Sequence, residues 1–114
     1  MDCLFCKIVG GEIPARKIFE DEQSIAFYDL HPQAPVHVLV VPRKHFSSLA
    51  QIDNSSEGEA LLGHLLGVVN KIAVAQKLTY GFRTVINTGV DGGQTVNHLH
   101  LHLLAGRAME WPPG

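Results

Sequence analysis

The sequence predicts one α+β domain, in which a largely antiparallel sheet of about five strands packs with one long and one short helix. Three observations support this prediction. Short stretches of strand composition are grouped around one long stretch of helical periodicity. Two of the strand stretches are separated only by a turn, which favours antiparallel pairing. With 114 residues, the chain is too short to bury two separate cores, so residues 1–114 form a single domain.

Two stretches have the apolar spacing of helices. Residues 4–9 carry apolar side chains at positions 4, 5, 8 and 9, and a glycine pair follows, which predicts a short helix. Ser56 and Glu59 have the spacing of a capping box. Apolar residues then recur at helical spacing, so the long helix is predicted to run from about residue 57 to residue 76.

Five stretches have the composition of strands. Residues 16–20 and 24–29 flank an acidic turn and predict a hairpin. Residues 36–41 form a β-branched run, which predicts a buried strand. Residues 82–87 and 96–104 predict the last two strands of the sheet.

Charge and hydropathy argue against several classes of function. Lysine plus arginine total 9 and aspartate plus glutamate total 11, so no basic excess favours nucleic-acid binding. The longest near-apolar run, residues 36–42, is far shorter than the about 20 residues that cross a membrane, so we expect no membrane partner. The N-terminus has no basic region before an apolar stretch, so we expect no secretory signal and a cytoplasmic location.

The sequence from residue 98 to residue 103 alternates strictly between histidine and leucine. In a strand, His98, His100 and His102 would share one face at a spacing of about 6.6–7 Å, with the leucines on the other face. Serine, threonine or lysine would serve a solvated face equally well, whereas imidazoles titrate near pH 6.5. The pattern therefore predicts a site of chemistry on this strand.

Two kinds of chemistry fit such a row of histidines. In one, the histidines ligate a catalytic zinc that activates water. In the other, a neutral imidazole attacks phosphorus while a neighbouring imidazole moves the proton. The loop at residues 92–95, Gly-Gly-Gln-Thr, favours the second, because its backbone, amide and hydroxyl donors suit an anionic oxygen.

Cys3 and Cys6 form a pair with the two-residue gap that is common at tetrahedral zinc sites. A reduced buried pair and a redox pair are the alternatives, and the redox pair is the weaker because no strand of thioredoxin type precedes it. Several histidines are available as further zinc ligands, namely His31, His45, His64 and His98. We expect His64 to lie on the surface of the long helix.

Residues 96–104 resemble the defining motif of the histidine triad superfamily, in which three histidines alternate with apolar residues. Residues 29–37, 91–95 and 109–114 are similar to one branch of it, the histidine triad nucleotide-binding proteins, which are purine nucleoside phosphoramidases. The likeness extends over nearly the whole chain. It implies the histidine-triad fold and a homodimer in which two sheets join into one continuous sheet.

The resemblance implies a role for each catalytic histidine. His100 matches the nucleophile that attacks the α-phosphorus of a purine nucleotide whose leaving group is an amine, which gives a nucleotidyl-histidine intermediate. His102 and His37 match the residues that contact the phosphate and handle the proton of the leaving group. Catalysis of this kind requires no cofactor.

The nucleotide contacts follow from the same resemblance. Asp29 would accept hydrogen bonds from the ribose hydroxyls. The phosphate would be held by Asn87, Gly93 and Thr95. An apolar slot would hold the purine and discriminate weakly between adenine and guanine; its residues are Leu4, Phe5, Ile8, Ile13, Phe27 and Leu30.

Some bacterial members of the superfamily have a structural zinc, and the matching ligands here are Cys3, Cys6, His45 and His98. Two other functions fit the same fold. One is hydrolysis of diadenosine polyphosphates or nucleotidyl transfer, and the other is a purine nucleotide-binding interaction protein whose hydrolysis is vestigial. The intact histidines count against the second of these alternatives.

Overall fold

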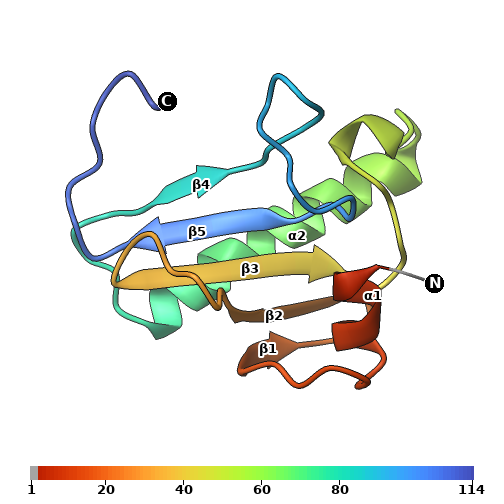
Figure 1. Cartoon of the computed structure of the whole chain (residues 1–114), viewed down its shortest axis with the longest axis horizontal. Helices are drawn as coiled ribbons and strands as arrows, with labels where there is room; N and C mark the ends of the chain where they lie inside the picture. Colours follow the sequence, from red (N-terminus) through yellow and green to blue (C-terminus); the bar gives the residue numbers. More distant parts are fainter. Residues whose placement is uncertain (1–2) are drawn as a thin grey trace.

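The computed structural model describes residues 3–114, and within them one antiparallel sheet in the order β1-β2-β3-β5-β4 carries the long helix on one face (Figure 1). The strands are β1 Lys17–Glu20, β2 Ser24–Tyr28, β3 Val36–Pro42, β4 Arg83–Val85 and β5 Leu101–Ala105. The helices are α1 Leu4–Val9 and α2 Ser56–Ala75, with the 3-10 turn η1 Leu49–Gln51 between β3 and α2. The predicted α+β class and antiparallel sheet are confirmed.

Alternation along the central strands divides the core into two clusters. Val38 and Val40 of β3 face α2, whereas Leu39 and Val41 lie in the cluster that contains α1. The α2 cluster also contains Ala26, Ile52, Leu65, Val68, Val69, Ile72, Leu99, Leu101 and Leu103. The α1 cluster also contains Phe5, Ile8, Ile25 and Phe27. Leu4, Phe5 and Ile8, which were predicted to surround a purine, are therefore on α1, and Phe27 is on the sheet face that α1 covers.

Both helices begin at capped residues. The Sγ atom of Cys3 accepts a hydrogen bond from the backbone N–H of Cys6 at the start of α1. The hydroxyl oxygen of Ser55, not of Ser56, accepts the N–H of Gly58 at the start of α2. The predicted capping box is therefore wrong by one residue. Met1 and Asp2, which entered the prediction that no secretory signal is present, lie outside the described residues.

The last strand is shorter than its sequence predicts, because β5 begins at Leu101 and not at residue 96. Its partner β3 ends at Pro42, which has no N–H to continue the ladder. The backbone N–H of Leu99 instead donates to the carbonyl of Phe46, at 2.7 Å. His98 and His100 consequently precede the strand, and only His102 lies within it. The predicted strand at residues 82–87 is likewise shortened, to β4.

By length and composition alone, α2 is long and apolar enough to cross a membrane. The sequence prediction considered only the run at residues 36–42 and therefore missed this helix. Its inner face is buried against the sheet through Gly58, Leu65, Val68, Val69, Ile72 and Ala73. Its outer face also has apolar residues, since Leu66 is 50% and Val74 is 74% exposed. The helix therefore has one apolar face that the sheet covers and apolar side chains on the other.

Candidate functional site

The three histidines of the alternating segment take part in two adjacent clusters. The imidazole of His98 faces Cys3, whereas the imidazole of His102 faces His37. His100 lies between them, with its ring centroid 5.0 Å from that of His102 and 5.1 Å from that of Phe5. The prediction of one regular row at strand spacing is therefore wrong, because residues 98–100 are not in the strand.

A single hydrogen bond orients the ring of His100. Its Nδ1 atom lies 2.7 Å from the backbone carbonyl oxygen of His98. A carbonyl oxygen only accepts, so Nδ1 carries the hydrogen and Nε2 holds the free lone pair. Burial lowers the pKa of His100, which is 5% exposed, and thereby keeps the ring neutral at pH 7. A neutral imidazole with a directed lone pair is the form that a nucleophile requires.

The hydrogen on His37 is fixed by the backbone of Gln33, whose N–H donates to Nδ1 of His37 at 3.0 Å. The neutral ring of His37 therefore carries its hydrogen on Nε2. That atom lies 2.9 Å from Nδ1 of His102 and 3.5 Å from a carboxylate oxygen of Asp29. His102 accepts at Nδ1, so its own hydrogen is on Nε2. The two rings thus form a directed hydrogen-bonded pair.

Burial and the neighbouring imidazoles of His100 and His37 lower the pKa of His102 to about 4. Burial also lowers the pKa of His37, and the negative charge of Asp29 partly opposes this shift. Both rings are therefore neutral at pH 7 in the free protein. An additional negative charge beside them would favour the protonated form of the pair.

A hollow of about 410 Å³ opens beside this pair of histidines. Most of the residues predicted to contact a nucleotide line it, namely Leu4, Phe5, Ile8, Ile13, Phe27, Asp29, Leu30, His37, Thr95 and His102. His100 is not among the lining residues but packs between Phe5 and His102, which are. Asn87 and Gly93 also do not line the hollow. The apolar walls and the few polar groups at one side have the character of a small-molecule site.

Sequence reasoning missed several lining residues, namely Pro14, Ala15, Tyr28, His31, Gln33, Leu39 and Val96. One of them had a usable signal, because Leu39 is two residues after His37 in a predicted strand and so shares its face. Gln33 had none, because it acts on His37 through its backbone N–H, which every residue but proline has.

The side chain of Asn87 supports the loop that was predicted to hold phosphate. Its amide nitrogen donates to the carbonyl of Gly92 at 2.7 Å. A Cβ atom at Gly92 would lie 2.3 Å from the carbonyl oxygen of Thr88, so only glycine fits there. The amide of Gln94 donates to the carbonyl of Ser47 at 2.7 Å and fastens the loop to the segment after β3. The loop is therefore held in place, and Thr95 at its end lines the hollow.

The four residues predicted to bind zinc are brought together. The Sγ atom of Cys3 lies 3.3 Å from Nδ1 of His98, and the Sγ atom of Cys6 lies 3.3 Å from Nδ1 of His45. The two Nδ1 atoms are 3.2 Å apart, and all four ligand atoms lie within 4.8 Å of one another. Burial and the neighbouring Cys3 raise the pKa of the Cys6 thiol. Two sulfur and two nitrogen atoms in this arrangement can hold a metal ion.

A hydrogen bond to the backbone orients the ring of His98 so that it could bind a metal ion. Its Nε2 atom donates to the carbonyl oxygen of Pro42 at 2.9 Å, so the lone pair of Nδ1 faces the cysteines. The cysteine and histidine cluster therefore presents a free lone pair where a metal ion requires one.

Asp29, His37 and His102 also lie close enough together to be considered as metal ligands. There, however, the N–H of Gln33 occupies Nδ1 of His37, so the Nε2 atom that faces the other two groups carries a hydrogen. This cluster is therefore suited to proton transfer, whereas the cysteine and histidine cluster, in which Nδ1 of His98 has a free lone pair, is suited to metal binding.

Comparison with known proteins bears on the same residues. The HIT domain family model matches residues 10–109. The chain belongs to the HIT domain family. An uncharacterized HIT-like protein of Synechococcus elongatus is 54% identical over 113 residues, which cover 99% of this chain and 97% of that protein.

Solved structures of HIT proteins share the fold. A HIT family hydrolase from Legionella pneumophila matches with a TM-score of 0.94 and 47% identity, over 99% of this chain and 100% of that one. A histidine triad nucleotide-binding protein from Candida albicans matches with a TM-score of 0.82 and 33% identity, over 97% of this chain and 83% of that one. The fold predicted by resemblance to the superfamily is therefore confirmed.

The remaining histidines of the HIT protein lie away from the cysteine and histidine cluster. We expected His64 on the surface of the long helix, and it lies on α2 with its side chain 30% exposed and its Nε2 atom 2.7 Å from a carboxylate oxygen of Asp21. His31 lines the rim of the hollow beside Asp29. Of the four histidines predicted as possible further zinc ligands, only His45 and His98 lie beside Cys3 and Cys6.

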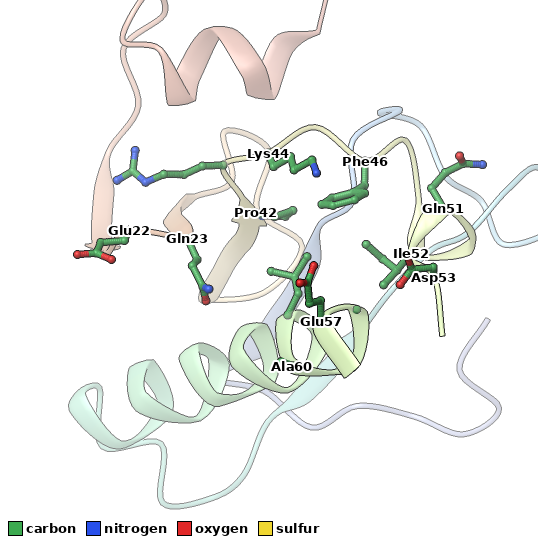
Figure 2. Close-up of a pocket in the computed structure, with 13 residues that line it drawn as sticks. Glu22, Gln23, Pro42, Lys44, Phe46, Gln51, Ile52, Asp53, Glu57 and Ala60 are labelled. Atoms are coloured by element: carbon green, nitrogen blue, oxygen red, sulfur yellow. The ribbon is translucent and has the colours of Figure 1, made fainter. Parts of the chain in front are cut away.

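A larger hollow, of about 620 Å³, lies elsewhere on the HIT domain. Figure 2 shows it above the first turns of α2, with Phe46 and Ile52 among its apolar side chains and Glu22, Lys44 and Glu57 among its charged ones. None of its lining residues in the described part of the chain is a histidine or a cysteine. The smaller hollow, which adjoins the histidines, is therefore the candidate active site.

Proposed function

We propose that this HIT protein is a purine nucleotide-binding hydrolase that cleaves the P–N bond of nucleoside 5′-phosphoramidates through a nucleotidyl-histidine on His100. The observation that carries the proposal is the set of ring tautomers, which places the free Nε2 lone pair of His100 beside the directed pair of His37 and His102. The resemblance to the histidine triad nucleotide-binding branch, and relatives described as a hydrolase and as a nucleotide-binding protein, support it.

The first half of the reaction forms a bond between His100 and phosphorus. The Nε2 lone pair attacks the α-phosphorus, and the bond from phosphorus to the leaving amine breaks. The amine nitrogen takes a proton from the pair of His37 and His102, whose protonated form is favoured by the negative charge of a bound phosphate. The amine leaves neutral, and the nucleotide stays on His100.

The second half hydrolyses the intermediate. A water molecule attacks the same phosphorus, and the pair of His37 and His102 accepts the proton of that water. The bond between His100 and phosphorus breaks, which restores the neutral imidazole and releases a nucleoside monophosphate. The proton that the pair gave to the amine is thereby replaced, so the cycle closes without a cofactor.

The apolar wall of the hollow suits a purine, and Asp29 suits the ribose. One oxygen of the Asp29 carboxylate accepts the backbone N–H of His31 at 2.8 Å, and the other faces His37. Each carboxylate oxygen has a further lone pair available for a ribose hydroxyl. Thr95 would hold the phosphate with its hydroxyl, while Asn87 and Gly93 would act by shaping the loop before it.

The charge of the hollow favours an amine leaving group over a polyphosphate. In the described part of the chain, its lining includes no lysine or arginine, and apart from histidines its only charged residue is Asp29. A diadenosine polyphosphate carries several negative charges that such a site leaves uncompensated, whereas an amine brings none. We therefore place diadenosine polyphosphate hydrolysis and nucleotidyl transfer second, and a purely binding role third.

We further propose that the cysteine and histidine cluster binds a structural zinc through Cys3, Cys6, His45 and His98. Zinc prefers sulfur and nitrogen ligands, and four protein ligands leave no open position for catalysis. The metal would tie α1 to the segment that precedes β5. The reduced thiols of Cys3 and Cys6 also fit the cytoplasmic location that we propose for the protein.

We propose that the protein is a homodimer. In the described residues, β4 pairs only with β5 and leaves its other edge at the border of the sheet. The outer face of α2 carries the exposed side chains of Leu66 and Val74. Pairing of two β4 edges and two α2 faces would cover both features and give one continuous sheet.

Turnover of adenosine 5′-phosphoramidate and of diadenosine tetraphosphate, each with and without a chelator, tests the proposed function. We expect the phosphoramidate to be hydrolysed much faster, and chelation to leave the rate unchanged at moderate temperature. Guanosine 5′-phosphoramidate should be hydrolysed at a similar rate. Turnover that requires added metal would support a metallohydrolase, and faster turnover of the polyphosphate would support the second candidate.

A further inference from the structure

The loop at residues 31–35 determines which nitrogen of His37 carries the hydrogen. The N–H of Gln33 donates to Nδ1 of His37, at 3.0 Å. If this N–H moved away, either nitrogen of His37 would be free to carry the hydrogen, and in one of the two tautomers Nε2 would no longer donate to His102. The direction of the hydrogen bond between His37 and His102 therefore depends on the position of Gln33.

A residue from the far end of the chain holds Gln33 in place. The Nε and Nη2 atoms of Arg107 both donate to the carbonyl oxygen of Gln33, at 3.1 and 3.0 Å. The Nη1 atom of Arg107 donates to the carbonyl of Ala108, at 3.2 Å, and so fixes the guanidinium itself. The planar fork of arginine can give two N–H groups to one oxygen, which lysine cannot do in this way.

Packing next to Arg107 keeps the same two segments in contact. Gly106 has a φ of +94°, and a Cβ atom there would lie 2.8 Å from Cβ of Pro35, so only glycine allows this approach. Ala105, the last residue of β5, pairs with Val36, which follows the loop. The strand that carries His102 therefore continues directly into the segment that holds Gln33.

We infer that Arg107 is a positioning residue for the proton-transfer step. It acts through the carbonyl of Gln33 on the loop, and the loop acts through the N–H of Gln33 on His37. This inference rests on the proposed function, because the proton in question is the one that the leaving amine takes. Arg107 does not line the hollow in the described chain, so its effect is on proton transfer and not on nucleotide binding.

Two leaving groups separate this role from a general structural one. Adenosine 5′-phosphoramidates of a primary amine need a proton on the leaving nitrogen, whereas the p-nitrophenyl ester of AMP releases an anion that needs none. We expect Arg107→Gln to lower kcat roughly tenfold for the amine substrate, because a charge-assisted hydrogen bond to Gln33 is lost. KM should be nearly unchanged. In a single turnover, p-nitrophenolate should be released almost as fast as by the wild type, because only the later hydrolysis of the intermediate then uses the pair of His37 and His102, and Arg107→Lys should fall between the wild type and Arg107→Gln for the amine substrate.

Arg43→Gln is the matched control. Arg43 also donates from Nε to a backbone carbonyl, that of Asp21 at 2.7 Å, but it lies away from the candidate active site. Turnover of both substrates by this variant should equal that of the wild type. Equal losses in single-turnover release of the leaving group from both substrates in Arg107→Gln, or no loss in that step with either, would overturn the inference.

Nitrogen-15 NMR of the imidazoles in the unliganded protein tests the inference without any turnover. In the wild type, Nδ1 of His37 should be unprotonated and Nε2 protonated, and in Arg107→Gln the two tautomers should exchange. An unchanged His37 tautomer in Arg107→Gln would overturn the positioning role. Failure of the wild type to hydrolyse either substrate would instead overturn the proposed function and leave the NMR result to decide the role of Arg107.

Discussion

The carbonyl oxygen of His98 lies 2.7 Å from Nδ1 of His100, so the backbone of a residue in the cysteine and histidine cluster orients the ring of the proposed nucleophile. The imidazole of His98 is held separately, because its Nε2 atom donates to Pro42 at 2.9 Å. One short segment therefore serves two clusters through different atoms. The backbone of His98 thereby has a chemical function, and its side chain has a structural one.

Replacement of His100 should abolish most of the chemistry and little of the fold. We expect His100→Ala to lower kcat for adenosine 5′-phosphoramidate by about 10³-fold or more, because the attacking atom is lost. Purine nucleotide binding by isothermal calorimetry should persist. His64→Ala, which changes the same residue type in α2, is the control and should keep wild-type turnover. A His100→Ala enzyme within tenfold of the wild type would exclude His100 as the nucleophile.

His102 should matter less than His100. Proton transfer by a positioned side chain contributes about 10²–10⁴-fold, so His102→Ala should retain more activity than His100→Ala. The measurement is single-turnover kinetics of the amine substrate with both variants. Equal losses in the chemical step would mean that the two histidines do not have the separate roles assigned to them.

Removal of the metal-binding cluster should destabilise the protein before it stops turnover. The unfolded chain has no preformed site, so the binding energy of the metal appears as stability of the fold. We expect about one zinc per chain by elemental analysis. The double variant Cys3→Ala, Cys6→Ala should have a lower Tm, yet still turn over substrate at moderate temperature, since Pro42 keeps its hold on His98. Absence of zinc, or an unchanged Tm in the double variant, would favour a reduced thiol pair.

Acid should destabilise the fold through the buried histidines. The pKa of His102 is about 4 in the folded protein, below the unfolded value of about 6.5, so folding favours its neutral form. This contribution is fully present above pH 6.5 and is lost as the pH falls through about 4. Urea unfolding at several pH values should show a smaller slope of stability against pH for His102→Asn than for the wild type. Identical slopes for His102→Asn and the wild type between pH 6.5 and about pH 4 would show that folding does not lower the pKa of His102.

The outer face of α2 should mediate dimerisation. Leu66 and Val74 are exposed in one chain, and lysine at either position would place a charge in the proposed interface. Light scattering coupled to gel filtration should give a dimer for the wild type and a smaller mass for Leu66→Lys with Val74→Lys. Glu12→Lys, which reverses a charge in the exposed segment between α1 and β1, is the control for added charge. A monomeric wild type would contradict the proposed dimer.

The sequence predicted elements well where local signals and tertiary contacts agree. Helical spacing identified α1 and α2, and the acidic turn identified the hairpin of β1 and β2. The prediction failed at residues 96–100, where strict alternation of histidine and leucine suggests a strand. The partner strand ends at Pro42, and the peptide of Leu99 bonds to Phe46, so the ladder does not extend there. A pattern within one segment does not report where its partner stops.

The site was predictable to the extent that it depends on side-chain types. The side chains of the cysteine and histidine cluster lie together as the resemblance implied, and so do those of the apolar wall of the hollow. The contributions of Gln33 and Pro42 were not predictable, because both act through backbone atoms that the sequence does not distinguish. Those contacts decide which nitrogen of each imidazole is free, and therefore which cluster can bind a metal and which can move a proton.

The stereochemistry at phosphorus tests the central claim most directly. A phosphorothioate analogue of the adenosine phosphoramidate, chiral at phosphorus, can be hydrolysed in oxygen-18 water and its product configuration determined by phosphorus NMR. Two successive displacements, first by His100 and then by water, predict overall retention of configuration, whether or not the intermediate accumulates. Inversion would mean that water attacks phosphorus directly, which would contradict a nucleotidyl-histidine on His100.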